Sequence, residues 1–247
     1  MGLLHKKTKP TIEFIAKIPH LKDVEDIQPL PSNRFLPDWW RSSPWSNDLN
    51  TPTPTDRLVR QCPMMPELFS SGYILPMWAD TTLYFNSKTQ EWRWRCGNSP
   101  SPFSIQIFTP EQFTTQTDYK YQNKVATAVF QFINPWKVKT SPGYSIFQLP
   151  LFYHSFDDVA IMPGTYDGNV VLTDKLEIGY FTDDKEVFIK KGTPLVQYIP
   201  YKKTNIKMLV RDFNEEDNKE ETKMKLIKST TFKNRYYSDN RSRGTDE

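Results

Sequence analysis

The stretch from Ile161 to Tyr201 constrains the fold of this chain more than any other. Apolar and polar residues alternate over 186–189 and again over 195–199, the period expected of half-buried strands. Turn-forming residues separate these runs at 167–168, 183–184 and 191–192. The spacings are too short for helical crossovers, so the pattern predicts strand, turn, strand, turn, strand and a mainly β fold.

The rest of the chain favours the same class. It has 247 residues, of which 37% are hydrophobic, enough for a sizeable core in one large domain with appendages. Twenty prolines against nine glycines argue against a helical bundle, because proline ends helices but is tolerated at strand edges. Short strand signals recur from residue 72 to residue 201. We therefore predict a β-sandwich or β-clip-like core over 72–201, preceded by a region over 1–71 and followed by an extension over 202–247.

The N-terminal region contains a predicted strand over 11–18 and then an extended arm over 26–55 that is rich in proline and tryptophan. A short helix around Asp38 to Ser42, capped by Asp38, is expected inside the arm. The candidate partner-binding residues are Phe35, Trp39, Trp40 and Trp45. The favoured interpretation is that the tryptophans attach the arm to its own core, and the alternative is that they contact a partner.

Two further segments carry strong strand patterns. Residues 92–95 alternate Trp-Arg-Trp-Arg, which places the tryptophans on one face and the arginines on the other and predicts one buried face. Arg93 and Arg95 could hold a phosphate or a single-stranded nucleic acid, but an ordinary solvent-facing side explains them better. Residues 136–139 and 144–153, the latter bent at Pro150, predict a core hairpin around a tight turn at 141–143.

The extension after Tyr201 changes in composition. Acidic residues come first and lysines last between Glu215 and Lys228, with opposite charges three and four residues apart. This order suits the helix dipole and predicts a charged, mostly exposed helix over these residues.

Motifs that carry catalysis or bind cofactors are missing from the sequence. It contains no nucleophile elbow, Walker loop or Gly-x-Gly-x-x-Gly. Cys62 and Cys96 are too few for a metal site and are expected to be reduced and partly buried. An iron site would need His20, His154 and one of Asp157 or Asp158 to converge, which their spacing does not suggest. We predict no cofactor and no metal.

Net charge and hydropathy limit the kinds of partner that the sequence predicts. The net charge of +3 is too balanced to indicate nucleic-acid binding. No run approaches about eighteen apolar residues, and the N-terminus lacks the apolar core of a signal peptide. We therefore expect protein partners, no membrane span and no secretion by a signal peptide.

Residues 161–201 resemble the second half of the dUTPase-like β-clip fold. The likeness rests on the turn Tyr166-Asp167-Gly168 and on the strand from Gly192 to Gln197. It implies that Tyr166 and Asp167 form a possible ligand turn. The catalytic aspartate of that family corresponds to Pro163 here, and proline has no carboxylate to activate a water. The resemblance therefore implies the fold without that chemistry.

A second resemblance covers nearly the whole chain from about Ile12 onward. Its motifs are Cys-Pro at 62–63, GYILPMWAD at 72–80, FINPW at 132–136, GYS at 143–145, LPLFYH at 149–154 and GTP at 192–194. Together they are similar to an uncharacterised family of tailed phages, notably of marine and cyanobacterial hosts, and of some bacteria. The resemblance implies a viral origin and brings no established activity.

Three functions follow from the residues and the resemblances together. The favoured one is a non-enzymatic structural or interaction component of a virus particle, associating with itself or with other virion proteins. The first alternative is an intracellular phage protein that binds a host factor. The second alternative is a dUTPase-like nucleotide hydrolase, which Pro163 opposes.

Overall fold

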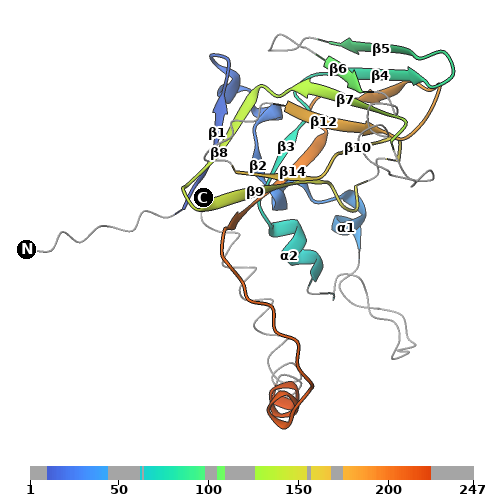
Figure 1. The fold of residues 1–247 in the computed structure, drawn as a ribbon. Helices are drawn as coiled ribbons and strands as arrows, with labels where there is room; N and C mark the ends of the chain where they lie inside the picture. Colours follow the sequence, from blue (N-terminus) through green and yellow to red (C-terminus); the bar gives the residue numbers. More distant parts are fainter. Residues whose placement is uncertain are drawn as a thin grey trace, which may run out of the picture. The chain divides into compact units, whose positions relative to one another are not determined.

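The protein is mainly β, as the sequence predicts (Figure 1). The structure is a computed structural model that describes residues 10–43, 62, 64–97, 105–108, 126–154, 157–167 and 175–223. The chain forms two compact units, Met1–Lys203 and Thr204–Glu247. Within the described residues, no helix combines the length and the apolar character needed to cross a membrane.

Fourteen strands of the described residues form four sheets, and every pairing is antiparallel. The largest has the order β11-β9-β14-β3-β2, with bounds Gly164–Tyr166, Tyr144–Pro150, Pro194–Lys202, Tyr73–Pro76 and Leu30–Pro31. The second has the order β10-β12-β7-β6, with bounds Val159–Ile161, Lys175–Tyr180, Ala128–Ile133 and Ile105–Phe108. The third has the order β13-β4-β5, with bounds Val187–Ile189, Thr81–Asn86 and Glu91–Cys96. The fourth pairs β1 (Ile12–Ala16) with β8 (Trp136–Thr140).

All four sheets contribute to one hydrophobic core. Phe132 of β7, Tyr198 of β14 and Leu83 of β4 belong to it and are almost completely buried. Trp78, in the connection between β3 and β4, packs edge-on against Phe132 with ring centroids 6.3 Å apart. Burial of large aromatic rings dominates the energetics of such a core, at about 1.5–3 kcal/mol for each fully buried side chain. The alternating strands therefore close around a shared interior.

The predicted hairpin of residues 136–153 is wrong. A tight turn does join β8 to β9, with the amide of Tyr144 donating to the carbonyl of Ser141 at 3.2 Å. The two strands nevertheless belong to different sheets, because β8 pairs with β1 and β9 pairs with β14 and β11. The nine-residue β14 runs in register along the whole of β9, and β11 takes its other edge. No edge of β9 is left for β8.

Short helices cover the N-terminal part of the first unit. They are the 3-10 turns Leu21–Asp23, Glu25–Ile27 and Ser32–Phe35, and the α-helices α1 (Asp38–Ser42) and α2 (Met64–Ser70). The bounds of α1 agree with the prediction, but the predicted cap is wrong. Pro37 occupies the capping position, and its carbonyl accepts the amides of Trp40 and Arg41 at 3.0 and 3.1 Å. Asp38 is already the first helical residue, where its carboxylate favours the helix through the dipole instead.

The second unit begins with an extended segment and continues into a helix. Residues 204–213 have no regular secondary structure, and residues 215–223 are helical and mostly exposed. The helix begins at Glu215 as predicted, and the predicted end at Lys228 lies outside the described residues. Asn214 and Asp217 form a reciprocal capping pair, with the Asp217 amide donating to Asn214 Oδ1 at 3.0 Å and the Asn214 amide to Asp217 Oδ2 at 2.9 Å.

Candidate protein-interaction site

Two tryptophans of the arm, Trp39 and Trp40, contact other parts of the same chain. Trp40 is only 5% exposed and packs against Phe69 of α2, with ring centroids 4.9 Å apart. The indole N–H of Trp39 donates to the backbone carbonyl of Tyr153 at 2.8 Å. Phe35 is half-buried beside a small cavity, and Trp45 lies outside the described residues. These contacts agree with the favoured interpretation for Trp39 and Trp40, since both help to attach the arm.

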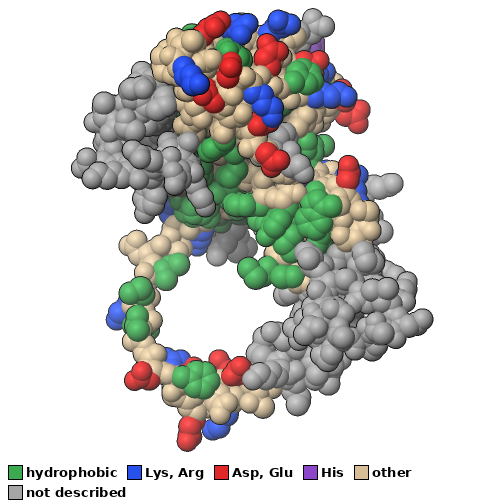
Figure 2. Space-filling model, turned by 90° about the vertical axis from the view of Figure 1, so that its right-hand side faces the viewer, with side chains coloured by type: hydrophobic (Ala, Val, Ile, Leu, Met, Phe, Trp, Pro, Cys, Tyr) green, Lys and Arg blue, Asp and Glu red, His purple; other side chains and the backbone are tan. Residues whose placement is uncertain are grey.

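Part of the aromatic surface around the arm remains exposed. Trp39, Phe152 and Tyr153 each keep more than a third of their side-chain surface in contact with solvent. Figure 2 shows hydrophobic side chains gathered across the middle of one face of the molecule, with a region of mixed charge above them. A patch of this kind is typical of a contact surface, because large aromatic rings are the usual anchors of protein interfaces.

Tyr166 and Asp167, the possible ligand turn, both make contacts within the fold. Tyr166 ends β11 and packs edge-on against Tyr198, with ring centroids 6.5 Å apart. Burial raises the pKa of Tyr166 far above its usual range, so the phenol stays protonated. Asp167 forms an ion pair with Lys203, the residue that follows β14. Both side chains therefore tie β11 to β14.

The residues considered for a metal site are not brought together. Within the described part of the chain, no group of three or more His, Cys, Asp or Glu side chains could hold a metal ion. His20 lies 3.6 Å from Asp23, and Asp158 forms a 2.7 Å ion pair with Lys185. His154 is half-buried, and this burial lowers its pKa. Cys62 and Cys96 are both partly buried, as expected, and the thiol of Cys96 donates to the carbonyl of Gly97 at 3.4 Å.

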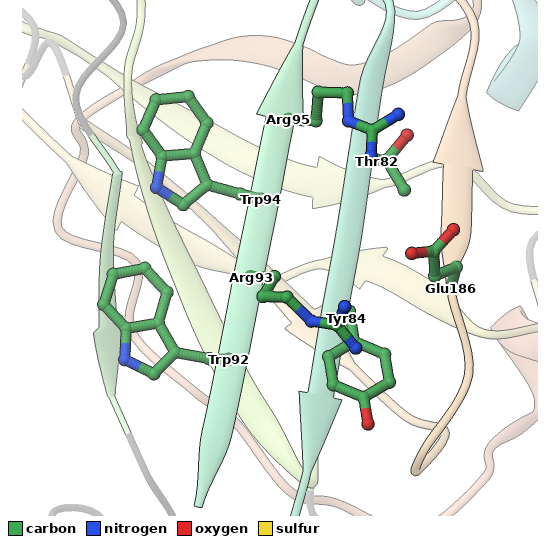
Figure 3. A pocket seen from close by; sticks show the side chains of 7 residues that line it. All are labelled: Thr82, Tyr84, Trp92, Arg93, Trp94, Arg95 and Glu186. Atoms are coloured by element: carbon green, nitrogen blue, oxygen red, sulfur yellow. The ribbon is translucent and has the colours of Figure 1, made fainter.

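The expected buried face of residues 92–95 is wrong, although the alternation itself is confirmed. Figure 3 shows Arg93 and Arg95 reaching across β4, while Trp92 and Trp94 project from the other side of β5. The tryptophans remain 40% and 37% exposed. Trp94 shares a cross-strand row with the buried Leu83, so its side does face the core. However, β5 ends the strand order of its sheet, and among the described residues no further strand on that edge helps to cover its side chains.

The opposite side of the same strand forms a shallow hollow of about 360 Å³. It is lined by Thr82, Tyr84, Trp92, Arg93, Trp94, Arg95 and Glu186. The guanidinium of Arg93 lies 4.3 Å above the ring of Tyr84, and its Nε lies 3.3 Å from the carboxylate of Glu91. Phe188 of β13, which is 62% exposed, continues the row of Thr82 and Arg95 across the sheet. Sequence reasoning missed Tyr84 and Phe188, because cross-strand register brings them to this face.

We use the name hairpin surface for the aromatic and arginine side chains of the hollow together with Phe188: Tyr84, Trp92, Arg93, Trp94, Arg95 and Phe188. Tryptophan, tyrosine and arginine are the residues most enriched among those that dominate binding energy at protein interfaces. Each can bury a large area while still offering a polar group at its tip. The hairpin surface is therefore suited to a partner that is apolar on one side and acidic on the other.

A second exposed surface lies in the C-terminal unit. Five large apolar side chains between residues 206 and 213 are 68–87% exposed. They are Ile206, Met208, Leu209, Val210 and Phe213, and we call this segment the apolar run. Sequence reasoning missed it, although the alternation of Ile206, Met208 and Val210 in a stretch beyond the predicted core was a usable signal.

Comparison with other proteins assigns no identity. No protein-family model matches this chain, and no curated protein matches it either. The assignment of function therefore depends on the geometry of its own surfaces.

Proposed function

We propose that this protein is a non-enzymatic structural or interaction component of a virus particle. In this proposal it associates with other copies of itself or with neighbouring particle proteins through its C-terminal extension. The particle is suggested by the resemblance to tailed-phage proteins, and the mode of association by the surfaces described above.

The observation that carries the proposal is the apolar run. Five large apolar side chains that are 68–87% exposed on one short segment have a substantial hydration cost. Fully burying each of them is worth about 1.5–3 kcal/mol, whereas ordering the backbone costs about 1–2 kcal/mol for each residue. The segment is already followed by a capped helix, and Arg211 is held by Asp217, so part of the ordering cost is met before a partner arrives.

The test is self-association of the purified full-length protein. We expect sedimentation velocity to show an oligomer whose population rises with protein concentration. The triple variant Ile206→Asp, Met208→Asp, Val210→Asp should be monomeric, because three charges cannot be buried at an apolar contact. Lys207→Asp is the matched control, since it adds negative charge to the same segment without removing an apolar side chain. It should associate as the native protein does.

Mass spectrometry of purified virus particles tests the other half of the proposal. We expect peptides of this protein in the particle, in a fixed ratio to the other particle proteins. A native protein that is monomeric at all concentrations and missing from particles would contradict the proposal and favour binding to a host factor.

A further inference from the structure

We infer that the apolar run and the helix that follows it dock on the hairpin surface of a second copy of this chain. This inference rests on the proposed association through the C-terminal extension and adds the identity of the receiving surface. It is supported by the match between the apolar and basic groups of the hairpin surface and the apolar and acidic groups of the extension.

The receiving surface has two chemically different sides on one strand. The rings of Trp92 and Trp94, 40% and 37% exposed, lie on one side of β5, and the guanidinium groups of Arg93 and Arg95 lie on the other. Residues two apart on a strand are separated by about 7 Å, so each pair forms a short ladder of like side chains. Among the described residues β5 ends the strand order of its sheet, so a ligand that passes around this edge could contact both pairs.

The extension carries the matching two chemistries in sequence order. The apolar run comes first, and the helix over 215–223 then holds five carboxylates against two lysines, a net charge of −3. Arg211, which precedes the helix, forms an ion pair with Asp217. Glu215 and Glu216 stand exposed at the start of the helix. If the apolar run lies against the two tryptophans, a turn of the chain at 213–214 brings Glu215 and Glu216 near the two arginines.

The dimensions of the two partners agree. The eight residues of the apolar run span about 26 Å when extended, and the six residues of β5 span about 20 Å. In a dimer with two-fold symmetry each copy supplies one extension and one hairpin surface, so the contact occurs twice. Glu186 lies across β4 from the arginines, which directs an acidic ligand toward the β5 side of the hollow (Figure 3).

The local charge favours a peptide of this kind over a nucleic acid. Residues 81–97 and 183–190 together contain five cations, Lys88, Arg93, Arg95, Lys185 and Lys190, against four carboxylates, Glu91, Asp183, Asp184 and Glu186. A net local charge of +1 is small for a polyanion, whose binding depends on many phosphate contacts. It suits a short acidic segment, for which two arginines are enough.

The experiment is charge reversal in trans, followed by sedimentation velocity of full-length chains. Arg93→Glu with Arg95→Glu should weaken self-association about tenfold or more, and Glu215→Lys with Glu216→Lys should do the same. An equimolar mixture of the two variants should associate again, because both junctions of the mixed dimer then pair opposite charges. Recovery on mixing requires docking between copies and excludes docking within one chain.

The controls keep the result specific. Lys137→Glu with Lys139→Glu reverses two cations at the same spacing on β8 and should leave association unchanged. Arg95→Glu alone repeats the test without disturbing the contact between Arg93 and Tyr84. Far-ultraviolet circular dichroism should show native folding for each variant used.

Three outcomes would overturn the inference. One is unchanged association after the arginine reversal while the Ile206, Met208 and Val210 variant is monomeric, which would retain the proposed function but not this receptor. Another is failure of the mixture to associate. The third is tight binding of a single-stranded oligonucleotide that Arg95→Glu abolishes while self-association persists.

Discussion

The hydroxyl of Tyr84 donates a 2.6 Å hydrogen bond to Oδ1 of Asp184, a residue one hundred positions later in the chain. The neighbouring Asp183 accepts hydrogen bonds from both the amide and the hydroxyl of Ser87, at 2.7 and 2.6 Å. These contacts fasten the β4–β5 hairpin to the turn that precedes β13. The surface that carries Trp92 to Arg95 is therefore held at its loop end by two carboxylates.

This arrangement predicts an acid-sensitive hairpin. The hydrogen bond from Ser87 lowers the pKa of Asp183 below its ordinary value of 3.8, and the hydrogen bond from Tyr84 lowers that of Asp184. A lowered folded-state pKa stabilises the protein above the unfolded-state pKa of about 3.9, and this contribution is lost as the pH falls through the folded-state value. The midpoint of thermal unfolding should therefore decline as the pH is lowered from about 5 to 3.

The double variant Asp183→Asn, Asp184→Asn should show a smaller decline over the same range, because its amides do not titrate. Asp212→Asn, at an exposed carboxylate outside the hairpin, should retain the native pH profile. Equal declines in the native protein and the double variant would show that these two carboxylates do not secure the hairpin.

Gly72 and Gly143 allow a matched comparison of backbone strain. Both have positive φ, +70° and +81°. A Cβ at Gly72 would lie 2.1 Å from the carbonyl oxygen of Tyr198, whereas a Cβ at Gly143 would meet no atom within 4 Å. Gly143→Ala should cost about 1 kcal/mol of unfolding free energy from φ alone.

Gly72→Ala should cost several times more than Gly143→Ala, because β14 must move away from β3 to admit the methyl group. Urea unfolding followed by tryptophan fluorescence measures both variants. Similar midpoints for the two would show that β3 and β14 can separate at this point without loss of packing.

The contact between Trp40 and Phe69 predicts how the arm is attached. Trp40→Ala empties a site that is 95% buried and should cost about 3–5 kcal/mol, concentrated in the small cluster of Trp40, Met65 and Phe69. We expect the arm to become sensitive to limited proteolysis within residues 26–43 while the β-sheet core stays intact. Trp40→Phe keeps an aromatic ring in the cluster and should be more resistant. An arm in Trp40→Ala as resistant as the native one would indicate that other contacts hold it.

Much of the secondary structure was predictable from local pattern. The alternating residues over 186–189 and 195–199 lie in or beside β13 and β14, and the short helix over 38–42 has the predicted bounds. Strand period and turn chemistry depend on near neighbours in the sequence, which is why these elements could be recognised. The acidic start of the C-terminal helix was recognisable for the same reason.

The pairing of the strands and the burial of their faces were decided only by the tertiary structure. The local pattern predicted that 136–139 and 144–153 pair as a hairpin. Instead β14, which begins about fifty residues after the start of β9, pairs with the whole length of β9. Local pattern likewise indicated that Trp92 and Trp94 share a face, and that much is correct. Whether that face is covered depends on which strand lies at the edge of the sheet, and register with β4 and β13 decides it. The alternation of residues along a strand indicates which side chains lie on the same face of the sheet. Whether that face is buried depends on distant parts of the chain that pack against it.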